Sequence, residues 1–394
     1  MSVHEGTPLR LTLLSLAAAA IAALTACSSG DVPRVDPTAL LDDGWPAVLA
    51  EAEGTTVRWW LYGGDDRINA YLDDVVAPAA AALGITLDRV PIDDTADAVQ
   101  RVLAEVEAET TGSIDLIWIN GENFANGVDA DLWAPGWSER LPNAALVDPA
   151  TVATDFGVPV EGRESPWSRA LFVYAHDPAR TPEPPRSTAE VLAYARANPG
   201  RITYPAVPDF TGSAFVRQAV TELGEVAAFE LLEELHPLLW RGGQVQPASE
   251  AELNDLFGNG EVDLAMSYDP SFVLSAVRRG QFAESVRPFT FDTTLNNVSY
   301  VAMPVTAPNP AGAMVVADLL LAPELQAAKA DPAVLGVPTV LDLDRVDAGD
   351  RAKFATTADS PWLLTDVGPL VAELAAERVE AIEQRWLAEI GGLA

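Results

Sequence analysis

The sequence predicts an α/β fold of two lobes, joined by two crossings of the chain and separated by a ligand cleft. Short apolar segments alternate with amphipathic segments along most of the chain, as in β-α-β units. About 350 residues remain after position 42, enough for two lobes. Hydrophobic residues make up 49% of the sequence, which supports packed cores.

The first lobe is predicted from three apolar segments with helices between them. Residues 57–62, 85–92 and 114–119 are the expected strands. Asp94 is a plausible N-cap for the helix that carries Val99 and Val102 on one face. This β-α-β-α-β order predicts a parallel, doubly wound sheet.

The second lobe is predicted to begin where the pattern becomes irregular. We expect a crossing strand at 171–175, and a return strand at 298–303. Between them we expect strands at 202–204 and 262–266, and helices at 188–197, from 211, at 230–235 and at 271–279. A final amphipathic helix is expected to carry Leu370, Leu374, Val379, Ile382 and Trp386. The predicted boundaries are 43–163 and 296–394 for lobe 1, and 164–295 for lobe 2.

Residues 1–27 are predicted to be a lipoprotein signal peptide. An apolar run from Leu11 to Ala23 follows Arg10 and is too short to span a bilayer comfortably. It ends in Leu24-Thr25-Ala26-Cys27, which looks like a bacterial lipobox. Acyl chains on Cys27 would anchor the protein at the outer face of the cytoplasmic membrane, with residues 28–42 as a flexible tether. The alternative is an ordinary cleaved signal with a chance cysteine.

The composition excludes several classes of function. The formal net charge of −34 excludes nucleic-acid binding through phosphate contacts and attracts cations, although solubility alone also explains it. Cys27 is the only cysteine, so no internal disulfide or cysteine metal cluster is possible. His176 and His236, the histidines outside the signal, lack a second ligand at metal-binding spacing. We therefore predict no metal, no cofactor and no enzyme activity.

Five short motifs resemble the extracellular solute-binding proteins of ABC importers, in the YnjB-type branch related to thiamine and polyamine binders. Their order and spacing extend the resemblance from about Trp45 to Trp386. The motifs are Gly63-Gly64-Asp65, Asn120-Gly121-Glu122-Asn123-Phe124, Glu164-Ser165-Pro166-Trp167, Pro208-Asp209-Phe210-Thr211-Gly212 and Ala322-Pro323-Glu324-Leu325-Gln326. The last resembles the family's Ser-Pro-Glu-x-Gln element, with alanine in place of serine.

The resemblance implies a type II periplasmic-binding-protein-like fold that closes on a small solute. It also implies an ABC permease and its ATPase as partners, and we expect the protein to act as a monomer. No Walker-type phosphate loop occurs, so ATP hydrolysis would belong to a partner.

The candidate ligand-binding residues lie where ligands meet open α/β sheets, beyond the carboxyl ends of strands. They are Tyr62, Gly63, Gly64, Asp65, Asn120, Gly121, Glu122, Asn123, Glu164, Ser165, Trp167, Asp209, Phe210, Thr211, Gly212, Tyr268, Asp269 and Asn297. Carboxylates beside aromatic faces suit an organic cation, such as a thiamine-like compound or a polyamine. Asp65 and Asp209 have an alternative role as helix caps, and Phe124 and Phe210 as core residues.

One segment points to a different ligand group. Residues 210–213 present hydroxyls and amides at a helix N-terminus, a natural anion site, so a ligand with both charges is also consistent. Two other classes stay open: a ligand-sensing lipoprotein that signals to a membrane kinase, and a lipoprotein enzyme acting on extracellular glycans, which needs only two carboxylates.

Overall fold

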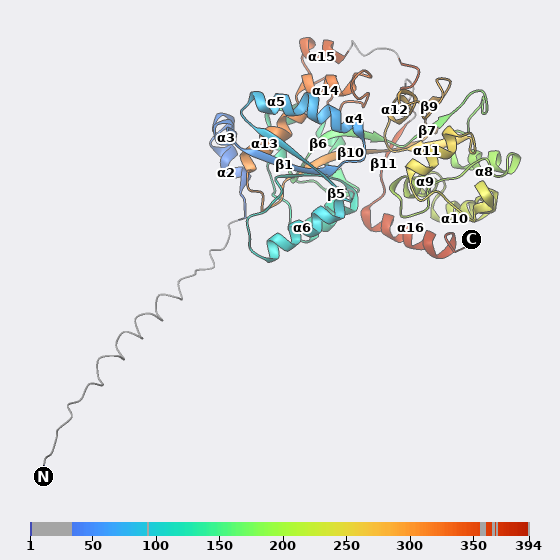
Figure 1. The fold of residues 1–394 in the computed structure, drawn as a ribbon, viewed down its shortest axis with the longest axis horizontal. Coiled ribbons are helices and arrows are strands. Elements are labelled where there is room, and N and C mark those ends of the chain that lie inside the picture. Colours follow the sequence, from blue (N-terminus) through green and yellow to red (C-terminus); the bar gives the residue numbers. More distant parts are fainter. Residues whose placement is uncertain (2–33, 93, 355–359, 365–366, 368, 393–394) are drawn as a thin grey trace.

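The computed structural model describes Met1 and residues 34–92, 94–354, 360–364, 367 and 369–392. Two α/β lobes lie side by side (Figure 1). The predicted signal peptide and Cys27 lie outside the described residues.

The first lobe is built on a six-stranded sheet. Its centre is β1 (Thr56–Tyr62), parallel to both β2 (Thr86–Ile92) and β3 (Leu116–Ile119). β10 (Thr294–Ala302) runs antiparallel to β3 and pairs in turn with β11 (Leu370–Ala372) and β6 (Glu164–Leu171). The predicted parallel β-α-β-α-β unit is therefore present, with an antiparallel extension.

Helices cover this sheet and bury a core around Trp59 and Leu116. The first turn of α6 is capped by Asp94, whose side chain accepts a hydrogen bond from the amide of Ala96, as predicted. The helices of this lobe are α2 (Pro37–Asp42), α3 (Trp45–Ala52), α4 (Asp66–Tyr71), α5 (Ala77–Ala82), α6 (Thr95–Glu107), α7 (Gly121–Asp129), α13 (Pro310–Leu320), α14 (Pro323–Ala330) and α15 (Ala348–Phe354). A π-helix at Leu72–Val76 joins α4 to α5.

The second lobe has a three-stranded antiparallel sheet in the order β8-β7-β9. Its strands are β7 (Val173–His176), β8 (Leu264–Ser267) and β9 (Arg287–Phe289). The helices around it are α8 (Thr188–Ala197), α9 (Phe210–Leu223), α10 (Glu225–Leu235), α11 (Glu250–Gly258) and α12 (Phe272–Arg278). The expected strand at 202–204 does not form. Ile202 is buried but accepts its backbone hydrogen bond from Trp240, outside any sheet.

The two crossings are neighbours. β6 leads out of the first lobe into β7, and β10 leads back, and these two strands pair antiparallel from Asn296–Leu171 to Ala302–Glu164. The predicted boundary at residue 164 is therefore too early: β6 belongs to the sheet of lobe 1, and the core of lobe 2 begins at Leu171. These paired strands connect the two lobes.

The path of the C-terminal segment shows that a second predicted boundary, which assigned residues 296–394 to lobe 1, is also wrong. It was expected in lobe 1, but after β11 the chain crosses to the second lobe and forms α16 (Ala376–Glu389). Trp386 and Ile382 are buried in the core of lobe 2, where the Trp386 indole donates to the Tyr204 hydroxyl at 3.1 Å. Figure 1 shows α16 lying beneath that lobe. Leu370, which was expected at the start of this helix, lies in β11 instead.

The predicted tether also differs from the structure. Residues 37–42 form helix α2, because Pro37 suits the first turn and the Asp36 side chain accepts from the amide of Thr38. Leu41 then packs into the core of lobe 1. Any tether is therefore shorter than residues 28–42.

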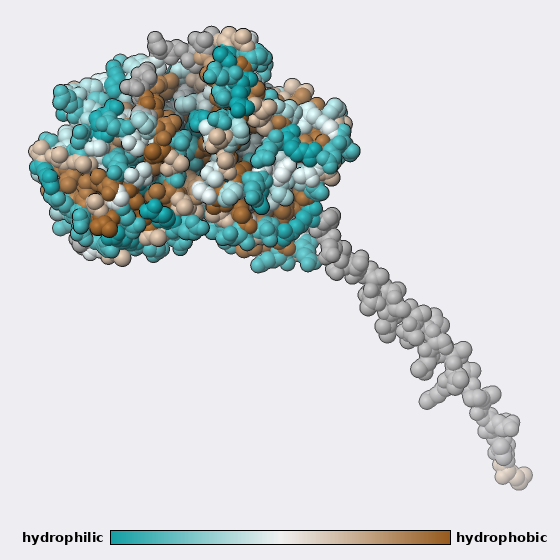
Figure 2. All heavy atoms as spheres, turned by 180° about the vertical axis from the view of Figure 1, so that it is seen from behind, coloured by the Kyte–Doolittle hydropathy of each residue, from teal (hydrophilic) through white to brown (hydrophobic). Residues whose placement is uncertain are grey.

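On the face shown in Figure 2, hydrophilic side chains cover most of the surface and hydrophobic side chains gather in smaller patches. Among the described residues, a single helix long and apolar enough to cross a membrane does not occur; α13 and α14 reach that length and composition only as a pair bent by 54°.

Candidate functional site

A cleft of about 980 Å³ lies between the lobes, and residues from both lobes and from α16 line it. This volume is at the upper end of the range for small-molecule sites. The structure brings most of the predicted residues to it: Tyr62, Gly64, Asp65, Asn120, Gly121, Glu122, Asn123, Trp167, Asp209, Phe210, Thr211, Tyr268, Asp269 and Asn297.

Four predicted residues do not line the cleft: Gly63, Glu164, Ser165 and Gly212. Glu164 and Ser165 are buried within β6, where they pair with β10. A side chain at Gly212 would approach the carbonyl oxygen of Pro205 to 2.1 Å, so this glycine is needed for packing. A Cβ at Gly63 would likewise approach the side chain of Pro91 to 2.5 Å.

Glu164 is a buried carboxyl beneath the cleft. Within the described residues, neither of its carboxyl oxygens has a hydrogen-bond partner. Burial, with the nearby Asp155, raises its pKa well above the usual range. Burial also raises the pKa of Asp155 to about 8. Asp155 accepts a hydrogen bond from the amide of Gly121 at 2.6 Å, so it supports the loop that enters α7.

Asp65 and Asp209 are helix caps and cleft residues at once. Asp65 accepts from the amides of Arg67 and Ile68 at 2.7 and 3.0 Å, at the start of α4. Asp209 accepts from the amides of Thr211 and Gly212, both at 3.0 Å, at the start of α9. Both carboxylates lie at the cleft surface because the helices that they cap begin there.

The same contacts contradict the anion site expected at residues 210–213. The amides that would bind an anion are already bonded to the Asp209 carboxylate. The Thr211 hydroxyl donates to Glu250 at 2.7 Å, and the Ser213 hydroxyl donates to Glu383. With these donors satisfied by carboxylates, the start of α9 presents negative charge to the cleft.

The lobe-2 wall holds two further carboxylates with raised pKa values. Burial raises the pKa of Glu250 to about 7, and the charges of Asp269 and Asp209 add to the effect. Burial raises the pKa of Asp269 to about 6, and Asp65, on the opposite lobe, adds to it. Asp65 and Asp269 line the cleft from opposite lobes.

Glu122 and Glu383 form a second acidic region. Burial raises the pKa of Glu122, followed by the charge of Glu383 on α16. Within the described residues, no hydrogen bond or ion pair satisfies the Glu122 carboxylate, which starts α7. Phe156 lies at the same end of the cleft and has φ of 43°, a left-handed conformation that is uncommon for a bulky residue.

The aromatic side chains of the cleft differ in exposure. Trp167 is only 1% exposed and packs edge-to-face between Trp59 and Trp118, with ring centroids 5.6 and 5.0 Å apart. Phe210, predicted as a cleft residue with the core as its alternative, is 45% exposed in the cleft, 5.3 Å from the ring of Tyr268. Phe124 is buried, as its core reading predicts.

Arg217 is a cation in the cleft wall that is already neutralised. Its guanidinium pairs with Glu373 through two hydrogen bonds of 2.9 and 3.1 Å, and both side chains are at most 2% exposed. The Tyr268 hydroxyl also donates to Glu373, at 2.7 Å. This pair joins α9 to the segment that follows β11, and it leaves little positive charge for a ligand.

Sequence reasoning missed several residues that line the cleft: Asp66, Trp118, Phe156, Arg169, Arg217, Glu250, Asn254, Arg279 and Glu383. The helix carrying Glu250 and Asn254 was not predicted, although Ser249 and Glu252 form a capping-box pattern, and the Ser249 side chain does accept from the amide of Glu252. Nothing local marks Glu383, because α16 was assigned to the other lobe.

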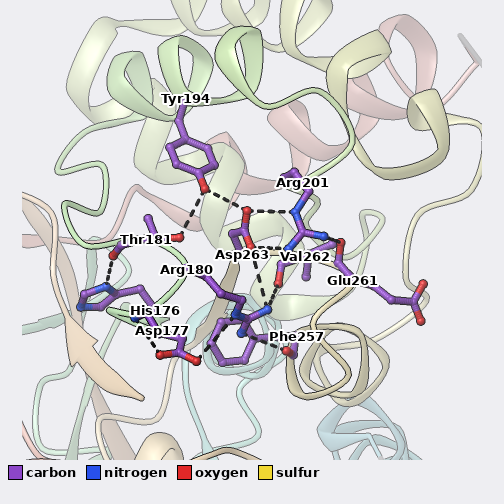
Figure 3. Close-up of polar contacts among 11 residues, drawn as sticks. His176, Asp177, Arg180, Thr181, Tyr194, Arg201, Phe257, Glu261, Val262 and Asp263 are labelled. Carbon is purple, nitrogen blue, oxygen red and sulfur yellow. Dashed lines mark hydrogen bonds and ion pairs between the residues drawn. The ribbon is translucent and has the colours of Figure 1, made fainter. Parts of the chain in front are cut away.

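His176 belongs to a polar network of the second lobe, away from the cleft (Figure 3). Its Nδ1 lies 2.7 Å from the carbonyl oxygen of Thr181. Asp263 is the centre of the network, with Arg201 and the Tyr194 hydroxyl hydrogen-bonded to it and Arg180 within 3.9 Å. None of these residues lines the cleft, which supports a structural role for His176.

Comparison with known proteins identifies the family. The model of a family described as bacterial extracellular solute-binding protein matches residues 74–348. The chain belongs to this family. As an extracellular solute-binding protein, it acts outside the cytoplasm, and the residues around its cleft are candidates for solute contacts.

Relatives agree with this assignment. Protein YnjB of Escherichia coli (strain K12) is 38% identical over 369 residues, which cover 88% of this solute-binding protein and 94% of YnjB. The periplasmic binding protein AfuA from Actinobacillus pleuropneumoniae, solved with fructose-6-phosphate, has a TM-score of 0.62 at 15% identity, covering 86% of this chain and 99% of AfuA. A periplasmic thiamin binding protein has a TM-score of 0.58 at 17% identity, covering 85% and 94%. The type II fold is thus confirmed, while the ligands named for these two neighbours, fructose-6-phosphate and thiamin, differ.

Proposed function

We propose that this protein is the substrate-binding component of an ABC importer and that its solute is a small organic cation, thiamine-like or a polyamine. The observation that carries the choice of a cation is the charge of the cleft. Eight carboxylates line it against three guanidinium groups: Asp65, Asp66, Asp94, Glu122, Asp209, Glu250, Asp269 and Glu383, against Arg169, Arg217 and Arg279. Ion pairing in a partly desolvated cleft favours a positively charged solute.

Aromatic faces support the same choice. Phe210 and Tyr268 lie together on the second lobe, and Tyr62 and Phe156 line the first. The faces of aromatic rings attract organic cations, especially where water is excluded. Flat rings and carboxylates on both lobes would contact one solute from two sides.

Capture would use lobe closure without chemistry. Asp65 and Asp269 line the cleft from opposite lobes, and their like charges oppose closure; the charge of Asp65 adds to burial in raising the pKa of Asp269. A cation between them replaces repulsion by attraction, so it binds the closed form better and shifts the population toward it. The paired strands β6 and β10 would serve as the hinge. The closed protein would then deliver the cation to a membrane permease and its ATPase.

We further propose that Cys27 carries a lipid anchor and that the protein works as a monomer at the outer face of the cytoplasmic membrane. The lipobox-like sequence before the only cysteine supports the anchor. Replacing Cys27 by serine should move the protein from the membrane fraction to the soluble fraction. Retention of the Cys27→Ser protein in the membrane would contradict the anchor.

The solute class is tested by a thermal-shift panel on the chain from Ser28, which retains every described helix and strand. The panel holds thiamine, its phosphates, putrescine, spermidine, sugars, amino acids and iron(III). A specific solute at 100 times its Kd should add about 2.7 kcal/mol of stability. We expect the shift with thiamine compounds or polyamines, and its loss in Glu122→Ala or Trp167→Ala. A shift with sugars or oxyanions alone would exclude the cation while leaving the importer role.

A further inference from the structure

One corner of the cleft, on the second lobe, gathers carboxylates without a cationic partner. We call Asp209, Glu250, Asp269 and the adjacent Asn254 the acidic corner; all four line the cleft. Thr211 joins two of the carboxylates, since its amide donates to Asp209 at 3.0 Å and its hydroxyl donates to Glu250 at 2.7 Å. The charges of Asp209 and Asp269 both contribute to the raised pKa of Glu250. Within the described residues, none of the three forms an ion pair. A fold rarely keeps such a group without a ligand for it.

The present partners of these carboxylates leave room for more donors. Glu250 accepts from the Thr211 hydroxyl at 2.7 Å, and Asp269 accepts from the amide and hydroxyl of Ser271, both at 2.8 Å. These partners are all uncharged, and an ionised carboxylate can accept about four hydrogen bonds. The acidic corner is therefore held in place by its own lobe but is not neutralised by it.

Asn254 supplies an independent sign of a missing partner. Asn254 is 8% exposed and lines the cleft, yet its side-chain oxygen Oδ1 has no hydrogen-bond partner among the described residues. It follows Glu250 by one turn of α11 and so lies on the same face of the helix. A buried carbonyl without a partner is unfavourable, and an N–H group from a solute would satisfy it.

The opposite lobe adds a fourth carboxylate and one guanidinium. Asp65 faces Asp269 and acts on it more strongly than Arg67 does. Arg67 donates through Nη2 to the carbonyl oxygens of Pro332 and Val334, at 3.4 and 3.0 Å, and its charge lowers the pKa of Asp269. Arg278 and Arg279, at the end of α12, also lie close enough to act on Arg67. The four carboxylates at this corner therefore outnumber the three guanidinium groups by one.

We propose that the acidic corner binds a protonated primary or secondary amine, with its N–H groups donated to Glu250, Asp269 and Asn254. The proposal rests on the proposed function and narrows its solute class. Carboxylate and carbonyl oxygens are directional acceptors and suit N–H donors, whereas a quaternary nitrogen has no N–H and is held by aromatic cages. Among the described residues, no three His, Cys, Asp or Glu side chains are grouped to hold a metal ion.

Calorimetric titration of the chain from Ser28 with putrescine, spermidine and choline tests the proposal. We expect putrescine or spermidine to bind, and choline to bind at least about tenfold more weakly. Glu250→Gln and Asn254→Ala should each weaken amine binding about tenfold or more, which corresponds to losing a hydrogen bond to a charged group. Glu252→Gln, on the same helix but outside the cleft, is the matched control and should bind as the unmodified protein does.

A second variant protects the test against misfolding. If Asn254→Ala lowers the melting temperature, Asn254→Asp keeps the side-chain size and should bind putrescine at least as tightly. Amine binding that is unchanged in both Glu250→Gln and Asn254→Ala would overturn the acidic corner, as would choline binding as tightly as putrescine; either result leaves the cation-importer function standing. If thiamine, choline and both polyamines all fail to bind, the proposed function fails and the acidic corner with it.

Discussion

The second lobe contains two groups of acidic side chains that differ in how their charge is balanced. Asp263 is bonded to Arg201 at its two oxygens, to Tyr194 at 2.8 Å, and has Arg180 close by. The acidic corner has hydroxyls and backbone amides instead of arginines. Both groups are held in place by hydrogen bonds. They differ in whether arginine side chains balance their negative charge. Balanced charge marks a structural network, and unbalanced charge at a cleft marks a place for a charged solute.

The largest expected effect lies in the pair of Arg217, which lines the cleft, and Glu373, which balances its charge. If charge balance rather than position decides whether an acidic residue is structural, Glu373→Gln should lower the stability of the fold. It leaves the Arg217 guanidinium buried without a counter-charge, which costs about 3–5 kcal/mol. Chemical denaturation measures the loss. A Glu373→Gln protein of unchanged stability would break the comparison.

A somewhat smaller loss is expected at the network in Figure 3. Asp263→Asn should destabilise the protein by about 2–4 kcal/mol, because Asp263 is nearly buried while the side chain of Arg201 is 36% exposed. Amine binding should not change, since the network does not line the cleft. Weakened binding in an Asp263→Asn protein that keeps its stability would reverse the roles assigned to the two groups.

In the absence of a solute, the acidic corner should make the protein less stable as the pH rises. The pKa of Glu250 is raised to about 7, so the folded protein keeps a proton that the unfolded chain has lost above its ordinary value of 4.5. Stability is therefore greatest below pH 4.5 for this group and falls as the pH rises to 7. Glu250→Gln should flatten that fall by up to about 1.4 kcal/mol per pH unit.

Urea denaturation of the unmodified protein and of Glu250→Gln between pH 4.5 and 7 measures how stability changes with pH. Glu252→Gln is the control. A slope that Glu250→Gln leaves unaltered would show that Glu250 is already ionised in the empty protein.

The smallest effect expected is on binding itself. A cation favours the ionised carboxylates, so putrescine affinity should increase as the pH rises through the values of about 6 for Asp269 and about 7 for Glu250. Binding should also release protons in this range. Titrations in buffers of different ionisation enthalpy measure the number released. Affinity that decreases with pH over this interval would contradict unbalanced acids in the site.

Much of the fold was predictable because local patterns specify it. The strand at Thr56–Tyr62, the cap at Asp94 and the helix at Thr188–Ala197 all follow from hydrophobic spacing and capping residues. The path of the C-terminal segment could not be predicted, because α16 has an ordinary amphipathic pattern. That pattern predicts a buried face for Ile382 and Trp386, and it does not say which lobe buries them.

The site was predictable mainly where motifs follow strands or begin helices. Asp65, Asn120–Asn123 and Tyr268 follow strands, and Asp209 begins a helix. Glu250, Asn254 and Glu383 reach the cleft through packing between elements distant in sequence, which no local pattern encodes. The anion site failed because the sequence allowed Asp209 either to cap the helix or to leave its amides free, and the structure shows the cap.

The most direct test of the cationic solute is to identify what the protein binds in its own cell. The protein would be purified without denaturation, then unfolded, and the released small molecules measured by mass spectrometry beside those from Glu250→Gln. We predict an amine-bearing cation that is enriched in the unmodified protein and depleted in the variant. A neutral or anionic solute, such as a sugar or a phosphate ester, retained equally by both proteins would contradict the cation cleft.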